Sequence, residues 1–107
     1  MISQDEFDSL VTTYDKHGWH LRRVVLTDLA KTPRHLAIDV VLDHGIIDAA
    51  WFSRPPAAGS IAWEIRFLGP SQYALVEHLD ENSPDFEEDL RHTERRLSDA
   101  IVKGRAA

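Results

Sequence analysis

Two histidines near the start of the chain have a spacing that can serve metal binding. His17 and His20 form an H-x-x-H pair, in which two imidazole nitrogens can reach one ion. Gly18 lies between them and favours the end of a helix, so the two rings would belong to different elements. No further histidine or cysteine stands close by in the sequence. We therefore expect surface histidines here, with no metal and no cofactor.

The groups that could carry catalysis do not form a known pattern. The chain has no G-x-S-x-G, no H-E-x-x-H, no phosphate-binding glycine loop and no cysteine nucleophile. Ser53 has no identifiable base. The carboxylates of Asp39, Asp48 and Glu64 are expected on the outer face of a sheet beside arginines, which is typical of a solvated surface. The sequence predicts no catalytic residue.

Two tryptophans flank a proline pair in AWFSRPPAAGSIAWEIR, residues 50–66. If Trp51 and Trp63 face each other across a hairpin, they form either the centre of a core or one wall of a ligand site. The second interpretation places His78 beside Trp63. Its candidate ligand-binding residues are Tyr14, Trp51, Ser53, Arg54, Trp63, Tyr73 and His78. We favour the core, because two indole rings supply much of the apolar surface that a chain of this length can bury.

A row of apolar residues is expected on the other face of the same sheet. Val25, Ala37, Phe52 and Ala62 would lie across it from strand to strand, on the side away from the helices. Single apolar groups are common on protein surfaces, whereas a contiguous row is typical of a contact patch. We therefore predict a homodimer or a protein partner that contacts this row or an edge strand.

Composition narrows the class of partner. The 107-residue chain has a formal net charge of -6, and a field of that sign repels the phosphates of nucleic acids. It contains no cysteine, which fits a reducing compartment. No stretch approaches the roughly 18 consecutive apolar residues of a membrane-spanning helix. These features predict a soluble, cytoplasmic, single domain of residues 1–107 that binds neither nucleic acid nor membranes.

Local signals predict a helix at the start of the chain. Ser3 and Glu6 form a capping box, and apolar residues then recur every three or four positions. Gly18 is a natural left-handed stop. The helix should span about residues 4–16.

The segments near the other end are a strand and a second helix. Residues 73–79 fit either a strand or a short helix, and we favour a strand. Ser83 is a helix cap and Pro84 suits the first turn of a helix that reaches about Lys103. The acidic start and basic end of this helix match the helix dipole.

Alternating apolar residues between the helices predict strands. His44-Gly45 would join strand 36–42 to the next strand by a tight turn, with Trp51 opposite Ile38. A bulge at Arg22-Arg23 would bring Trp19, Leu21, Val24 and Leu26 to one face.

The second predicted hairpin crosses the proline pair. Pairing Arg54 with Ser60 keeps every inward residue opposite another inward residue. The resulting pairs are Trp51 with Trp63 and, on the outer face, Asp48 with Arg66.

The predicted fold is α+β: a two-layer sandwich of an N-terminal helix, a four- or five-stranded antiparallel meander and a C-terminal helix, with both helices on one sheet face. This order resembles double-stranded RNA-binding domains, which hold phosphates with lysines where the second helix starts. The chain instead has the acidic segment PDFEE there, residues 84–88, so it lacks the phosphate-binding lysines of that family.

We expect a non-catalytic interaction or regulatory domain that forms a homodimer. The alternative is a small-molecule binding protein or minor enzyme with a pocket at the tryptophans.

Overall fold

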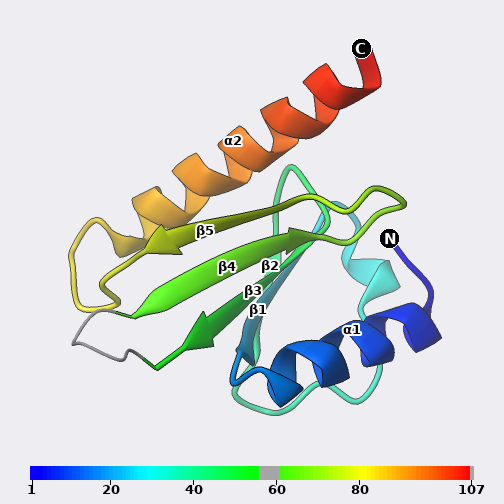
Figure 1. Ribbon diagram of the computed structural model, residues 1–107, viewed down its shortest axis with the longest axis horizontal. Helices are drawn as coiled ribbons and strands as arrows, with labels where there is room; N and C mark the ends of the chain where they lie inside the picture. The colour runs from blue at the N-terminus through cyan, green and yellow to red at the C-terminus, as the bar shows by residue number, and fades with distance from the viewer. Residues whose placement is uncertain (56–60, 107) are drawn as a thin grey trace.

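The computed structural model describes residues 1–55 and 61–106; Ser60, the predicted partner of Arg54, lies outside them. The elements are α1 (Gln4–Lys16), β1 (His20–Leu26), a 3-10 turn (Leu29–Lys31), β2 (Val41–His44), β3 (Ala49–Arg54), β4 (Ala62–Phe67), β5 (Ala74–His78) and α2 (Phe86–Ala106). A helix, a five-stranded and mostly antiparallel sheet, and a second helix follow in that order (Figure 1). The α+β class is confirmed.

The first helix begins and ends as its local chemistry requires. The Ser3 hydroxyl accepts the N–H of Glu6 at 3.1 Å and donates to the Glu6 carboxylate at 3.0 Å, so the capping box forms. Gly18, just past the helix, has a φ of 83°, a left-handed conformation that glycine adopts at little cost. α1 therefore spans the predicted residues.

The second helix starts close to its predicted cap. The Ser83 hydroxyl accepts the N–H of Asp85 at 3.2 Å immediately before α2. Pro84, which has no N–H to leave unpaired, follows this cap. The helix continues past Lys103, through Gly104, to Ala106.

The order of the strands differs from the predicted meander. The sheet runs β2-β1-β3-β4-β5, so β1 lies between β2 and β3 and pairs with β2 in parallel. The predicted hairpin at His44-Gly45 is wrong, and Ile38 is fully exposed outside the strands instead of opposite Trp51. The reason lies in β1, where residues 24–26 are all buried. A strand that is apolar on both faces is favoured in the sheet interior, with a strand on each side.

Two other strand predictions are confirmed. The pairing of β1 with β3 shifts register between Leu21 and Arg23, which is the predicted bulge. The bulge leaves Leu21 and Val24 on the same face of the sheet. Segment 73–79 contains a strand, β5, which forms one edge of the sheet.

The pairing of β3 with β4 keeps the predicted faces but is shifted by two residues. Trp51 lies opposite Ile65, and Trp63 lies opposite Ser53. Because side chains alternate along a strand, a shift of two leaves each residue on its own face. The two indole rings are therefore diagonal neighbours, with centroids 6.3 Å apart and planes at 75°.

The predicted cross-strand ion pair does not form. Arg66 lies opposite Ala50, and Asp48 precedes the first residue of β3. Asp48 instead accepts the main-chain N–H of Thr27 at 2.8 Å and the Thr27 hydroxyl at 3.0 Å. The shift in register moved Arg66 out of reach and left Asp48 to tie the end of β1 to the start of β3.

The helices cover opposite faces of the sheet, so their predicted placement on one face is wrong and the fold has three layers (Figure 1). The cause is β3, which is buried on both sides: Ala49 and Trp51 face α2, whereas Ala50 and Phe52 face α1. A strand with no polar face needs cover on both sides. One helix cannot supply it.

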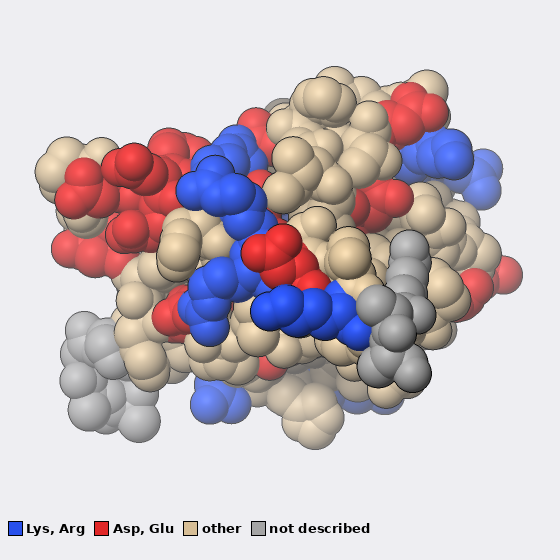
Figure 2. Space-filling model, turned by 90° about the horizontal axis from the view of Figure 1, so that it is seen from above, with Lys and Arg blue, Asp and Glu red and all other residues tan. Residues whose placement is uncertain are grey.

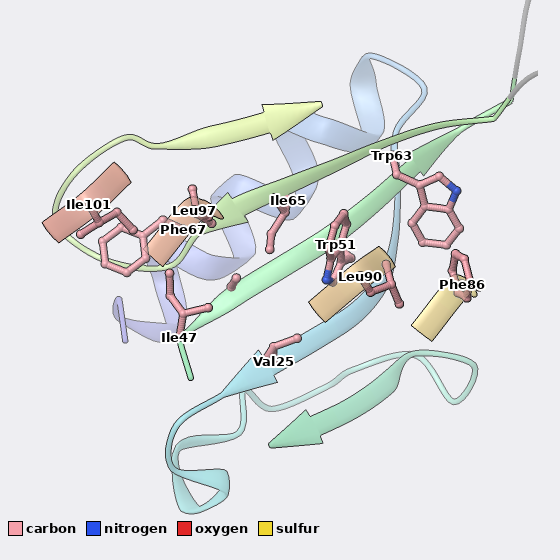
Figure 3. Close-up of a cluster of buried hydrophobic side chains, with 11 residues drawn as sticks. Val25, Ile47, Trp51, Trp63, Ile65, Phe67, Phe86, Leu90, Leu97 and Ile101 are labelled. Atoms are coloured by element: carbon pink, nitrogen blue, oxygen red, sulfur yellow. The ribbon is translucent and has the colours of Figure 1, made fainter. Parts of the chain in front are cut away.

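Each helix thus closes its own core. The α2-side cluster, shown in Figure 3, consists of Val25, Ile47, Ala49, Trp51, Trp63, Ile65, Phe67, Phe86, Leu90, Leu97 and Ile101. The α1-side cluster consists of Phe7, Val24, Leu26, Ala50, Phe52 and Leu68. The α1-side cluster is extended by half-buried apolar residues of α1 and of the β1–β2 connection.

Candidate interaction site

The predicted ligand-binding residues do not meet in one place. Trp51 and Trp63 are 0% and 1% exposed within the α2-side cluster, so both rings are core. Tyr14 lies on the opposite face, where its ring stacks on Phe52 with centroids 3.9 Å apart. The sheet separates the two sets, so Tyr14 and the tryptophans cannot form one wall.

Two polar members of the predicted ligand site contact side chains near the start of β1. Ser53 is buried, and its hydroxyl accepts an N–H of Arg22 at 3.0 Å. The Arg54 guanidinium lies over the Trp19 ring, 4.9 Å from its centroid. Both therefore stabilise the sheet end at which β3 finishes.

The two members on and near β5 differ. Tyr73 packs against the α2-side cluster, on the same sheet face as the two tryptophans. His78 is exposed, and Glu77 rather than His78 lies opposite Trp63. The predicted position of His78 beside Trp63 is wrong, because the pairing of β5 with β4 gives His78 the other parity.

The predicted contact row is divided between the two faces. Val25 belongs to the α2-side cluster and Phe52 to the α1-side cluster, and both are fully buried. Ala37 is exposed in the β1–β2 connection, and Ala62 is half-buried at the start of β4. These four residues form no surface, because the row assumed a sheet face without a helix.

The apolar surface that the chain does expose gathers along β2. The exposed large apolar residues among those described are Leu29, Ile38, Val41, Leu42, Ile46, Val76 and Val102. Four of these seven, at positions 38, 41, 42 and 46, lie on β2 or at its two ends. Because β2 is an edge strand, its outer N–H and C=O groups face no other strand. An exposed apolar edge of this kind is a template for another strand.

Ion pairs hold β2 in place on its α2 side. Asp43 accepts hydrogen bonds from Arg23 at 3.0 Å and Arg91 at 3.1 Å. Arg91 also donates at 2.9 Å to Glu94, a buried carboxylate that accepts Trp51 Nε1 at 3.2 Å. Partial burial alone would lower the pKa of Arg91, but the two carboxylates raise it above its ordinary value. The edge strand is thus anchored to the core by charged groups.

The turn after β2 approaches the core closely. A Cβ on Gly45 would lie 2.5 Å from Val25 Cγ1, so no other residue fits without a shift. The Gly45 N–H bonds to the Leu26 carbonyl at 3.0 Å. This glycine serves close packing against β1 and not the predicted hairpin turn.

The opposite edge of the sheet is different in character. On β5, Glu77 forms an ion pair with Arg96 of α2, and Val76 is the strand's exposed large apolar residue. Charged side chains are a common means of discouraging strand addition at an edge. Each edge carries an ion-paired carboxylate, Asp43 on β2 and Glu77 on β5, and the two edges differ in that β2 and its flanks expose more large apolar side chains.

The outer surface of α2 is polar. Figure 2 looks onto this side and shows acidic side chains gathered at the end where α2 begins, with Lys and Arg farther along. The first turn carries Glu87, Glu88 and Asp89. Val102 is the exposed large apolar residue on this helix. This face presents charge, whereas the β2 edge presents apolar groups.

A groove of about 720 Å³ lies between α1 and the connection that leads into β2. Its volume is typical of ligand-binding clefts. The large apolar residues of its lining are Phe7, Val11, Trp19, Leu21, Leu36 and Val40. His35 in its wall has a φ of 64°, an uncommon conformation for a residue other than glycine. Sequence reasoning missed this groove, because strand 36–42 was predicted where the connection runs.

Neither a metal site nor a membrane-spanning helix is found in the part of the chain that the structure describes. Residues 1–55 and 61–106 hold no group of three or more His, Cys, Asp or Glu that could bind a metal ion. None of the helices described is long and apolar enough to cross a membrane. No known family, curated protein or solved structure matches this chain. Its function must therefore be argued from its own geometry.

Proposed function

We propose that the protein is a non-catalytic cytoplasmic interaction domain that forms a homodimer through its β2 edge. The supporting observation is the concentration of exposed apolar side chains over residues 38–46, on a strand that has a partner on one side only. Adding a strand to such an edge pairs its free backbone groups and removes the apolar side chains from water. The alternative of a small-molecule pocket at the tryptophans is not proposed, because its residues lie on two faces of the sheet.

A second copy of the chain fits this edge because its apolar residues are spaced symmetrically. Ile38 and Ile46 lie four positions before and after Leu42. An isologous contact, in which each chain uses the same surface, would pair two β2 strands in antiparallel orientation about Leu42. Each Leu42 then meets its counterpart, and Ile38 and Ile46 lie beyond the two ends of the paired strands.

The same pairing is compatible with the charges of the edge. It places Val41 of one chain opposite the partner's Asp43. The Asp43 carboxylate is already turned to Arg23 and Arg91 of its own chain. Its charge is therefore compensated before a partner arrives, and no unpaired carboxylate has to be buried.

Sedimentation of Leu42→Lys tests the dimer. The parent protein should sediment as a dimer of its 12.2 kDa chain at tens of micromolar, and Leu42→Lys should sediment as a monomer. Lysine at this position would place two like charges face to face across the dimer axis. The matched control is Val76→Lys, which puts the same charge on the other edge strand and should leave the dimer intact.

Circular dichroism and urea unfolding establish whether Leu42→Lys is folded. Leu42 is 41% exposed, so the monomer should keep the helix content of the parent protein. A monomeric parent protein at tens of micromolar would refute the proposal. A folded Leu42→Lys that remains a dimer would place the interface elsewhere.

A further inference from the structure

The groove between α1 and the β1–β2 connection lies over an open stretch of strand edge. β2 pairs with residues 23–26 of β1, whereas the preceding residues of β1, His20, Leu21 and Arg22, pair with no strand on that side. All three of these residues line the groove. An extended chain lying in the groove could therefore pair with β1, just as β2 does farther along.

The groove has room for a side chain as well as a backbone. Trp19, Leu21, Leu36 and Val40 are only half-buried, so their apolar surface is accessible from the groove. Covering it with an apolar side chain of a partner would remove further apolar surface from water, which favours binding.

The charges of the lining favour a basic occupant. Three carboxylates, Asp8, Asp15 and Asp39, line the groove against two guanidinium groups. One of these, on Arg22, is already bound to Glu81 at 2.6 Å, and the Asp15 carboxylate lies 3.7 Å from the ring of His20. Arg34 forms no ion pair among the described residues. Among the described residues Asp8 and Asp39 form no ion pair. The chain as a whole carries -6, so a cationic segment would also be attracted over a distance.

The wall formed by the connection is tied to the helix. The Gln4 side chain accepts the main-chain N–H of Arg34 at 2.9 Å and donates to the Arg34 carbonyl at 3.4 Å. His35 follows in its left-handed conformation, and the Val40 N–H bonds to the Ala37 carbonyl at 3.0 Å. A wall held in this way is preorganised, which lowers the entropy lost on binding.

We propose that this groove binds an extended segment of a partner protein that pairs with residues 20–22, inserts an apolar side chain and carries Lys or Arg beside it. The proposal does not depend on the β2 dimer. It uses the α1 face and the free edge of β1, whereas the dimer uses β2.

Thr12 and Thr13 provide a matched pair of test positions. Both are exposed on α1, and each hydroxyl donates to the carbonyl four residues earlier at 2.9 Å. Thr12 lines the groove and Thr13 does not. Thr12→Trp should fill the groove, and Thr13→Trp should place the same ring outside it.

The probe is a fluorescein-labelled ten-residue peptide of alternating valine and lysine, compared with a peptide in which glutamate replaces every lysine. In fluorescence polarisation the lysine peptide should bind the parent protein at least about tenfold more tightly than the glutamate peptide, and Thr12→Trp should weaken its binding by about tenfold or more. Thr13→Trp should change the affinity by less than about twofold. NMR amide shifts on binding should centre on residues 20–22.

Three results would overturn the proposal. The first is equal binding of the two peptides, and the second is equal binding to the two tryptophan variants. The third is a dimer that Thr12→Trp dissociates while neither peptide binds, which would make a second copy the occupant of the groove. Repeating the titration with Leu42→Lys separates the two proposals, because a monomer that still binds the lysine peptide retains the groove after the dimer is lost.

Discussion

The two faces of the sheet are closed to different degrees. On the α2 side a 21-residue helix lies over a cluster that includes both buried tryptophans and Phe86. On the α1 side a 13-residue helix has Phe7 as its buried residue, and its other apolar residues are half-buried. The groove lies on this second side. One face therefore supplies most of the apolar burial, and the other keeps surface available for a partner.

The interactions that hold the two faces also differ. The α2 side combines aromatic packing, with Trp63 against Phe86 at 5.4 Å between centroids, with the ion pairs that Arg91 makes to Asp43 and Glu94. The α1 side adds polar ties to its smaller core: the Tyr14 hydroxyl donates to Glu64, and Asp48 accepts from Thr27. Apolar burial is insensitive to pH, whereas these ties involve groups that titrate. We therefore expect the largest loss of stability from a substitution in the α2-side cluster, and pH-dependent losses from substitutions at Asp48 and Tyr14.

The largest loss is expected on the closed face. Trp63→Ala should lower the free energy of unfolding by about 3–5 kcal/mol, because it leaves a cavity between Trp51 and Phe86. Urea unfolding of parent and variant measures the loss. Iodide should quench Trp19, which is half-buried, more readily than the other two tryptophans. A nearly neutral Trp63→Ala together with free quenching of all three rings would show that the α2 side is not a closed core.

A smaller loss is expected at Asp48, and it should shrink as the pH falls. Partial burial by itself raises the pKa of Asp48, but the Thr27 N–H, the Thr27 hydroxyl and the Met1 ammonium together hold it below its ordinary value. A lowered pKa means that the stabilisation is complete above the unfolded-state pKa, about 3.9, and is lost as pH falls through the folded-state value. Asp48→Asn should cost about 1–2 kcal/mol at pH 7 and less near pH 3.

The measurement is urea unfolding of parent and Asp48→Asn across this acid range. Asp39→Asn is the control, since its carboxylate is exposed and forms no ion pair among the described residues. A cost at Asp48 that is the same at pH 7 and pH 3 would mean that its charge does not stabilise the fold.

The smallest loss is expected at Tyr14, and it should shrink as the pH rises. Burial, followed by the hydrogen bond and negative charge of Glu64, raises the pKa of Tyr14 above its ordinary value. The stabilisation is therefore complete below the unfolded-state pKa of about 10 and is lost as pH rises through the folded-state value. Tyr14→Phe keeps the stacking on Phe52 and should cost about 1 kcal/mol at pH 8. The free energies of unfolding of parent and variant, measured from pH 8 to pH 11, should converge as the pH rises. A constant difference across this range would contradict a stabilising hydrogen bond from Tyr14 to Glu64.

Part of the candidate site could have been recognised in the sequence. Three consecutive apolar residues, Val24, Val25 and Leu26, are typical of a strand covered on both faces, and they indicate an interior position for β1. Asp39 and Asp43, on either side of Val41 and Leu42, indicate an edge, because edge strands commonly carry charge. The groove carries no such signal, since its walls come from three separate stretches, within residues 7–15, 19–22 and 34–40, that share no pattern.

Local chemistry in the sequence determined where α1 begins and ends, where β1 bulges, and that Trp51 and Trp63 share a face. Each depends on neighbouring residues or on alternation within one hairpin, and both act at short range. The tertiary structure alone decided that β2 pairs with β1 in parallel and that the helices take opposite faces. Alternation assigns a side chain to one of two faces but does not say which strand lies alongside or which face a helix covers. Those choices follow from burying β1 and β3 on both sides at once, a condition that only the assembled sheet and its two helices can meet.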